Sequence, residues 1–261
     1  MMDRPGIDLR RVVLLTLSGL LVVLAATEFK AGLDSRGWAD YAGNDYRIYM
    51  QAVGRWMAGD GFYLPRQLTG PYAIQVGDVL YPPTAIWFML PFAFLPAAFW
   101  WALPAALLGY LLASWHPAMW SWPLLVACLA WPTALTLVVA GNPSMWIAAF
   151  VGAGLRFGWP GALVLLKPSL FPFGLAGVTK RGWWVAAATL AVITLPLASL
   201  IPDWLRAVFD GRGFEGPLYS VHDVPLVSFP VIAWAARSRK DQPDTAHPRE
   251  DPCSKAHSVR S

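Results

Sequence analysis

Charged residues are scarce in this sequence, and their scarcity decides the class of protein. Asp, Glu, Lys and Arg make up 14% of its 261 residues, where a soluble domain carries about 25%. None of them occurs between residues 79 and 155, and a segment of that length without charge cannot cover a water-exposed surface. A soluble globular fold is therefore excluded. Intrinsic disorder is excluded as well, because hydrophobic residues make up 56% of the chain.

The sequence also lacks the pattern of cysteines that forms a disulfide scaffold and the regular glycine repeat that forms a fibre. Of the two cysteines, Cys128 lies in an apolar run and Cys253 in the polar C-terminal tail, which excludes a disulfide scaffold. The glycines follow no three-residue period, so a collagen-like fibre is excluded. The net charge of +4 does not indicate nucleic-acid binding, because the basic residues stand at the ends of apolar segments, where they set membrane topology.

Familiar catalytic motifs are missing too. The chain has no D-x-D pair, no P-loop and no G-x-S-x-G elbow. Its four histidines have no metal-ligand spacing. Gly152 and Gly154 lie inside an apolar run with no strand before it, which favours helix packing over a dinucleotide turn. We therefore expect neither a metal nor another cofactor.

What the sequence does have is a series of apolar runs separated by proline. This pattern predicts an all-α, polytopic transmembrane bundle with about eight spans. The expected spans are residues 12–27, 84–95, 97–115, 121–140, 143–157, 160–178, 183–201 and 223–236. Several are shorter than the ~20 residues of a perpendicular helix, so some are expected to be broken or re-entrant.

Basic residues predict how the chain is oriented. Arg10 and Arg11 precede the first span, and eight spans would place Lys180-Arg181 and the basic group after 236 on the same, cytoplasmic side. A signal peptide cleaved near Ala25-Ala26 is the alternative for the first run. We expect one integral membrane domain, 1–236, in the plasma membrane, followed by a disordered cytoplasmic tail, 237–261.

One long polar stretch, residues 28–80, forms the predicted external loop, and loops of this length usually serve a function. Within it, Asn44 to Ala58 places apolar side chains at helical spacing, with Arg47, Gln51 and Arg55 on another face. This pattern predicts an amphipathic helix on the outer membrane surface, capped by Asn44 and ended by Gly59.

A few polar residues near the apolar runs are candidates for chemistry. Lys167 stands alone among apolar residues, and it is either a lysine that snorkels to the interface or part of an anion site. The break at 141–144 is either a turn or a polar site, and Tyr81 opens the second span. Asp45 is either a helix-start carboxylate or a general base beside cations that hold a phosphate.

These residues, in this order, resemble a known family. The carrying elements are Asp45-Tyr46-x-x-Tyr49, Gly59, Phe62-Tyr63, Tyr81-Pro82-Pro83, Pro91 to Pro96, Gly141-Asn142-x-x-Met145 and Lys167-Pro168. Over roughly residues 10 to 200 they resemble glycosyltransferase family 87, also catalogued as domain of unknown function 2029. This GT-C family includes polyprenyl-phosphate-mannose-dependent α-1,2-mannosyltransferases. Asn142 stands where the family usually has glutamine.

The resemblance implies a membrane hexosyltransferase whose site lies on the external face. Its donor would be a sugar, such as mannose, on a polyprenyl phosphate, and its acceptor an envelope lipid or glycan. Motif matching implies Asp45 as the catalytic base, with Asp40 as a further candidate. Arg47, Arg55 and Lys167 would hold the donor phosphate, and Tyr49, Tyr81 and Asn142 are other candidate site residues. Because the apolar runs end near residue 237, the chain is expected to be a relative shortened at its C-terminus.

Two other hypotheses stay open. A shortened relative could bind polyprenyl lipids or a partner without catalysis. The chain could also be a transporter or a scaffold unrelated to sugar transfer. Transporters place paired ionisable groups within their spans, and in the sequence only Lys167 stands in such a place.

Overall fold

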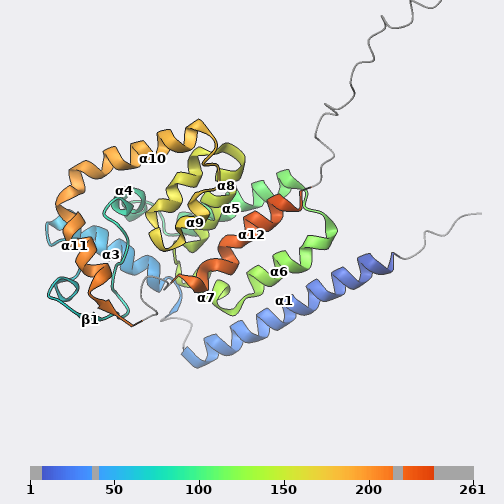
Figure 1. The fold of residues 1–261 in the computed structure, drawn as a ribbon. Helices are drawn as coiled ribbons and strands as arrows, with labels where there is room; N and C mark the ends of the chain where they lie inside the picture. The colour runs from blue at the N-terminus through green and yellow to red at the C-terminus, as the bar shows by residue number, and fades with distance from the viewer. Residues whose placement is uncertain (1–7, 37–40, 214–219, 238–261) are drawn as a thin grey trace, which may run out of the picture.

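The computed structural model describes residues 8–36, 41–213 and 220–237, and these are mostly helical. Figure 1 shows the arrangement of the elements. The α-helices are α1 (Leu9–Arg36), α3 (Asn44–Ala58), α4 (Ala85–Met89), α5 (Ala98–Trp115), α6 (Trp122–Ala130), α7 (Pro132–Ala140), α8 (Ser144–Phe157), α9 (Phe171–Gly174), α10 (Arg181–Thr194), α11 (Ile201–Phe209) and α12 (Val224–Ala235). Short 3₁₀ helices join them, namely η1 (Pro65–Gln67), η2 (Leu90–Ala93), η3 (Met119–Ser121), η4 (Trp159–Leu166), η5 (Pro168–Leu170), η6 (Leu195–Leu200) and η8 (Val221–Asp223).

Three helical segments in the described residues are long and apolar enough to cross a membrane: Leu9–Ala31, Ala98–Trp115 and Arg181–Phe209. The pair Met119–Ala130 and Pro132–Ala140 makes a fourth when it is counted as one span, bent by 58°. The bend lies at Trp131-Pro132, where proline interrupts the helical hydrogen bonds. The all-α membrane class is thus supported, and one expected span is broken.

The expected arrangement of about eight spans is not confirmed. Residues 84–95 form the short α4 and η2, and 160–178 form η4, η5 and α9. Residues 143–157 form α8, which has only 14 residues, most of them buried. Prolines divide the runs 84–95 and 160–178 into short pieces. Many residues of the three runs are buried in the protein core, while Phe94, Phe157 and Phe171 are exposed.

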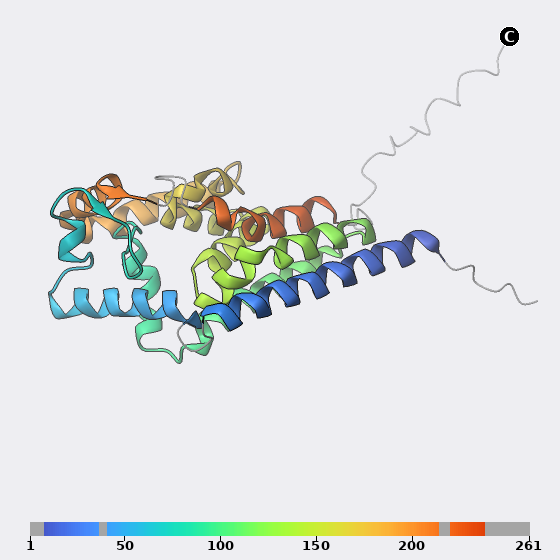
Figure 2. The same ribbon diagram turned by 90° about the horizontal axis from the view of Figure 1, so that it is seen from below.

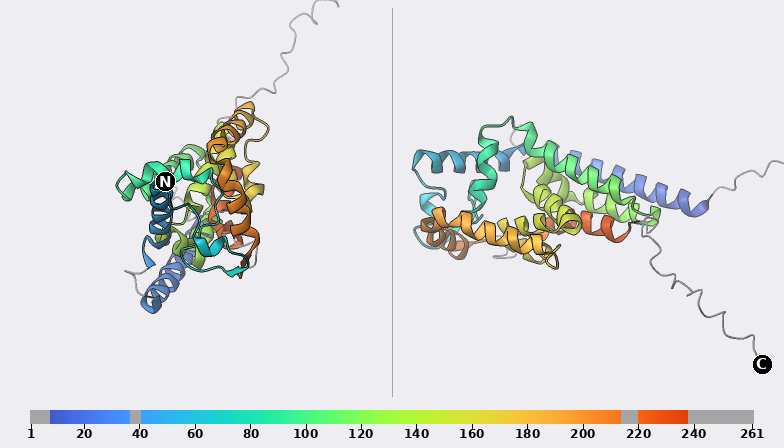
Figure 3. Two further views of the ribbon diagram at one scale, coloured as in Figure 1. Left: turned by 90° about the vertical axis from the view of Figure 1, so that its left-hand side faces the viewer. Right: turned by 90° about the horizontal axis from the view of Figure 1, so that it is seen from above.

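The helices form layers, as Figures 2 and 3 show. The long helix α1 lies along one side and packs mainly against α6. The helices α5 and α8 lie between it and the opposite side, which α10 and α12 cover. Many large apolar side chains of α1 are exposed in the isolated chain, as expected for a helix that faces lipid.

The buried helix α8 depends on glycine where other backbone segments approach it. A Cβ added to Gly154 would lie 2.7 Å from the Cα of Gly161, and one added to Gly161 would lie 1.9 Å from the carbonyl oxygen of Ala176. Gly152 is likewise buried within α8. The packing interpretation of Gly152 and Gly154 is therefore confirmed.

Helix α3 has the predicted bounds and ends at Gly59, whose positive φ closes its last turn. Its N-cap residue is Gly43, however, so the prediction that Asn44 caps the helix is wrong by one position. The backbone N–H of Gly43 donates to the Val139 carbonyl at 2.9 Å, which attaches the start of α3 to the end of α7.

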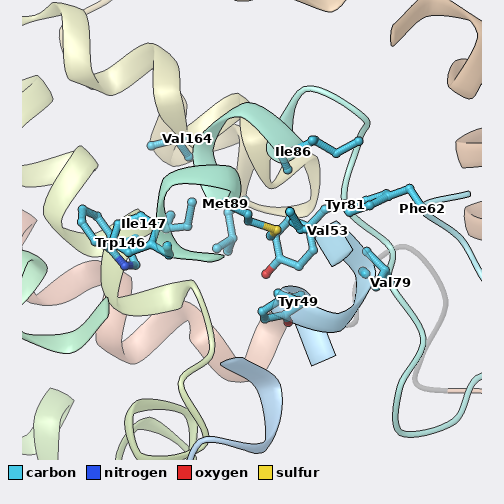
Figure 4. Packing of buried hydrophobic residues seen from close by; sticks show 14 of the residues in the cluster. Tyr49, Val53, Phe62, Val79, Tyr81, Ile86, Met89, Trp146, Ile147 and Val164 are labelled. Atoms are coloured by element: carbon cyan, nitrogen blue, oxygen red, sulfur yellow. The ribbon is translucent and has the colours of Figure 1, made fainter. Parts of the chain in front are cut away.

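The inner face of α3 lies in the main hydrophobic core. Tyr49 and Val53 pack there with residues of the following loop, of α4 and of α8, as Figure 4 shows. The loop after α3 also reaches α11, because the strands β1 (Tyr72–Ala73) and β2 (Gly211–Arg212) pair in parallel. The Tyr72 hydroxyl donates to the Ala207 carbonyl at 2.6 Å. Residues 28–36 of the predicted loop continue α1, which corrects the expected end of the first span, and residues 41–80 are folded against the rest of the protein.

Candidate functional site

A sharp turn between α7 and α8 carries the first polar side chain of the site, Asn142. The turn begins at Gly141, which has φ +77°, and a Cβ there would lie 2.8 Å from the Trp101 ring and 2.9 Å from Tyr46 Cβ. Only glycine fits this conformation and this space. The Asn142 Oδ1 atom accepts the backbone N–H of Ser144 at 3.1 Å, so the side chain is held against the start of α8.

Asn142 contacts Asp45 across the site. Its amide Nδ2 donates to Asp45 Oδ2 at 2.8 Å, which joins the start of α3 to the turn before α8. These residues are far apart in the sequence, and both belong to the motifs that resemble family 87. The structure therefore brings two of the predicted site residues into direct contact.

Lys167 lies on the other side of the Asn142 amide, between η4 and η5. Its Nζ atom donates to Asn142 Oδ1 at 3.3 Å and to Ser144 Oγ at 3.1 Å. It also forms an ion pair with Asp223 at 2.6 Å, and the two side chains are only 2% and 4% exposed. Lys167 does not snorkel to an interface, because it is buried and paired.

Asp223 completes the cluster and was not identified from the sequence. It lies in η8, directly before α12, and its Oδ1 atom is 2.8 Å from Ser144 Oγ while Oδ2 bonds Lys167. In the sequence it marks only the start of the last apolar run. A buried lysine needs a partner of opposite charge. That requirement was the signal in the sequence that could have led to Asp223. The site cluster is defined here as Asp45, Asn142, Ser144, Lys167 and Asp223.

The electrostatics of the site cluster favour a base at Asp45. Burial raises the pKa of the half-buried Asp45 carboxyl above its ordinary value. The hydrogen bond from Asn142 and the charge of Lys167 act in the opposite direction, and the charge of Asp223 adds to the increase. A carboxylate with a raised pKa accepts a proton more readily than one in water.

A groove of about 380 Å³ lies along α3 and reaches Ala93 of η2. Arg47 supplies its cation, and its Nη1 donates to the Ala42 carbonyl at 3.2 Å. The other lining side chains are mostly apolar. The groove is lined by Tyr46, Arg47, Met50, Gln51, Gly54, Met57 and Ala93.

Arg55 is not among the residues of this groove. Its Nη2 donates to the Phe62 carbonyl at 3.2 Å, so the guanidinium fastens the loop after α3. Burial lowers the pKa of Arg55 from its ordinary value, although an arginine so placed stays charged at neutral pH. The structure thus separates the three predicted phosphate ligands: Arg47 lines the groove, Arg55 holds the loop and Lys167 pairs with Asp223.

The two tyrosine candidates lie in the main hydrophobic core, Tyr49 on α3 and Tyr81 before α4. Tyr49 and Tyr81 pack edge to face with ring centroids 5.3 Å apart, and Figure 4 shows both in the core. Lys167 Nζ lies 5.8 Å from the centroid of the Tyr81 ring. Asp40, the further candidate for the base, lies outside the described residues, as does the tail from residue 238.

Comparison with known proteins adds no relative: no family model, curated protein or solved structure matches this chain. Within the described ranges, no three His, Cys, Asp or Glu side chains gather where they could hold a metal ion. The arrangement offers a carboxylate positioned by an amide, a buried ion pair behind that amide and a separate groove on α3 that contains one cation.

Proposed function

We propose that this protein is an integral membrane glycosyltransferase of the GT-C kind, similar to family 87. It would transfer a hexose such as mannose from a polyprenyl phosphate to an envelope lipid or glycan. The observation that carries the proposal is the site cluster. Asp45, Asn142 and Lys167 come from three separate motifs of the resemblance, and they meet in one hydrogen-bonded group. Motifs that matched by chance would have no reason to meet.

The chemistry that fits the cluster is a displacement at the sugar C1 atom. Asp45 takes the proton of the acceptor hydroxyl, and the acceptor oxygen forms a bond to C1. The bond between C1 and the phosphate oxygen breaks, and its electron pair leaves with the polyprenyl phosphate. This reaction needs a base on one side of C1 and a cation for the phosphate on the other.

Arg47 is the best candidate for that cation. It lines the groove on α3, and its guanidinium can hold phosphate through several N–H donors. The apolar groove residues Met50 and Met57 would contact the isoprenoid chain. Lys167 contributes less to phosphate binding, because Asp223 already balances its charge.

Charge distribution supports an external site in the plasma membrane. Arg156 bonds Ser114 near the end of α5, and Lys180 bonds the Arg156 carbonyl. Arg237 pairs through its backbone with Pro117, just beyond the same helix end. The site cluster instead lies near the start of α5, where the Trp100 indole donates to the Gly141 carbonyl. The 18 residues of α5 separate the two ends by about 27 Å, and the basic end faces the cytoplasm by the positive-inside rule.

A transporter is the second candidate, because Asp223 gives Lys167 the buried partner that the sequence lacked. Intramembrane ion pairs often mark transport pathways. The position of the pair argues against this reading. The pair contacts Asn142, which lies next to the start of the candidate span α5, so it lies toward one side of the membrane, whereas transporter sites lie near the middle.

The decisive experiment incubates membranes that contain the protein with radiolabelled polyprenyl-phosphate sugars and separates the products by chain length and head group. Asp45→Asn should reduce transfer by roughly 10²-fold or more, the scale of general-base catalysis. Asp60→Asn is the matched control, because Asp60 is an exposed residue just beyond the end of α3. Near-native transfer by Asp45→Asn would show that Asp45 is not the base. Absence of transfer by the wild-type protein from every such donor would reject the glycosyltransferase proposal.

A further inference from the structure

The Asn142 side chain has only one orientation that satisfies its neighbours. Three donors or potential donors face its Oδ1 atom: the Ser144 backbone N–H at 3.1 Å, Ser144 Oγ at 2.5 Å and Lys167 Nζ at 3.3 Å. A backbone N–H and an ammonium cannot accept a hydrogen bond. A flipped amide would direct its own NH₂ hydrogens at both of them. The NH₂ group must therefore point to Asp45.

Asp223 holds the groups that impose this orientation. Its Oδ2 atom accepts from Lys167 at 2.6 Å, and its Oδ1 atom lies 2.8 Å from Ser144 Oγ. Both carboxylate oxygens are thus engaged by side chains that also contact Asn142. The carboxylate is itself fixed, because the Asp223 backbone N–H donates to the Ser220 carbonyl at 2.9 Å in the turn before α12.

We propose that Asp223 is a positioning residue, which through Lys167 and Ser144 fixes the Asn142 amide toward Asp45 and so prepares that carboxylate for proton transfer. Asp223 is not part of the motifs that carry the resemblance, and its hydrogen bonds go to Lys167 and Ser144 rather than to Asp45. The inference rests on the proposed function of Asp45 as the base. It assigns the buried ion pair to the control of that base, rather than to phosphate binding.

The charged groups that act on Asp45 from other elements are Lys167 and Asp223, and they act with opposite signs. On α3 itself, Arg47 donates to the Ala42 carbonyl. Removing the charge of Asp223 by itself would lower the pKa of Asp45, whereas loss of the Asn142 hydrogen bond would raise it. The hydrogen bond has the larger effect on Asp45, so the positioning role predicts a raised pKa in Asp223→Asn as well as in Lys167→Met. General loosening of the fold would instead expose Asp45 to water and lower its pKa.

The test measures Asp45 directly, without requiring transfer. Infrared difference spectroscopy of the full-length protein in detergent follows the carbonyl band of its protonated carboxyl groups through a pH titration. The band that disappears in Asp45→Asn belongs to Asp45. This titration is compared among wild type, Asp223→Asn and Lys167→Met. The matched control is Ser169→Ala, which removes the nearby hydrogen bond between Ser169 and Ser220 at 2.6 Å but touches no residue of the site cluster.

We expect the Asp45 band to titrate at higher pH in Asp223→Asn and in Lys167→Met, and as in wild type in Ser169→Ala. Transfer by Asp223→Asn should fall roughly tenfold or more, because a misplaced reacting group slows the chemical step. An Asp45 band that titrates in Asp223→Asn as in wild type, or at lower pH, would overturn the proposal.

A double variant covers the case in which neither single variant folds. Lys167→Met/Asp223→Leu contains no unpaired buried charge, yet it removes the ammonium and the carboxylate that hold Asn142. We expect slower transfer and a higher Asp45 titration point, because the attraction of Lys167 outweighs the repulsion of Asp223. Wild-type transfer together with wild-type titration would refute the positioning role. Full transfer by Asp45→Asn would instead refute the proposed base, and the infrared shifts would still report on positioning.

Discussion

The buried ion pair of the site cluster allows a quantitative prediction about stability. Lys167 Nζ and Asp223 Oδ2 lie 2.6 Å apart, and the two side chains are only 2% and 4% exposed. Lys167→Met would leave the Asp223 carboxylate buried without its cation, and loss of one partner of a buried pair costs about 3–5 kcal/mol. The change to methionine keeps most of the side-chain volume, so little of this cost comes from a cavity. For a chain of this size, the melting temperature should fall by roughly 10 °C.

The double variant should behave differently from the single one. Lys167→Met/Asp223→Leu replaces the pair with apolar side chains, and such replacements are often neutral or even stabilising. We therefore expect it to melt close to wild type, well above Lys167→Met. The assay is thermal unfolding of the purified proteins in one detergent, followed by intrinsic tryptophan fluorescence. If Lys167→Met melts at the wild-type temperature, or if the double variant melts below Lys167→Met, the reasoning from buried charge is wrong.

Two further predictions concern packing and pH. Gly161→Ala should lower the melting temperature, because its Cβ would meet the Ala176 carbonyl oxygen and backbone must move, while Gly109→Ala, with open space around it, should not. Burial raises the pKa of Asp45 above 3.8. The Asp45 carboxyl group therefore makes its full contribution to stability below pH 3.8, and this contribution is lost as the pH rises through the folded-state pKa. The melting-temperature difference between Asp45→Asn and wild type should therefore grow with pH across that window, and a constant difference would contradict the assigned environment.

Much of the local structure follows from the sequence. The amphipathic period predicted α3 with its observed bounds, because a helix with one apolar face and a glycine after its last turn has few alternatives. The long apolar runs at α1 and α5 were predicted for the same kind of reason. The N-cap of α3 was misplaced by one residue. Gly43 is held there by a hydrogen bond from its backbone to Val139, a contact that local sequence cannot reveal.

The number of spans was harder to predict, because hydrophobicity does not distinguish lipid from a protein core. Helix α8 is apolar and mostly buried among other helices, and its glycines allow those helices to approach closely. A residue that faces lipid and one that faces a neighbouring helix look alike in a hydropathy pattern. Only the short lengths of the runs and their prolines indicated that some would not cross the membrane alone.

The candidate site was partly visible because its residues are exceptions to their surroundings. Lys167 and Asn142 interrupt apolar runs, so each was recognisable as a polar group that needs a partner. Asp223 stands at the edge of an apolar run, where a carboxylate looks like an ordinary helix start. Its partner is 56 residues away in the sequence, and no local pattern reports a contact of that range.

The free-energy cost of the buried ion pair between Lys167 and Asp223 bears on its role. A lysine and an aspartate buried together at helix ends cost free energy that an apolar pair would not, so stability alone gives no reason to keep them. Lys167 donates directly to the Asn142 amide, and Asp223 reaches that amide through Lys167 and Ser144. The amide has a single satisfied orientation. The orientation matters only if the group that it faces, Asp45, performs a task that depends on its position. The cost of the buried pair and the proposed role of the carboxylate therefore support each other, and the raised Asp45 pKa expected in Asp223→Asn tests the link between them.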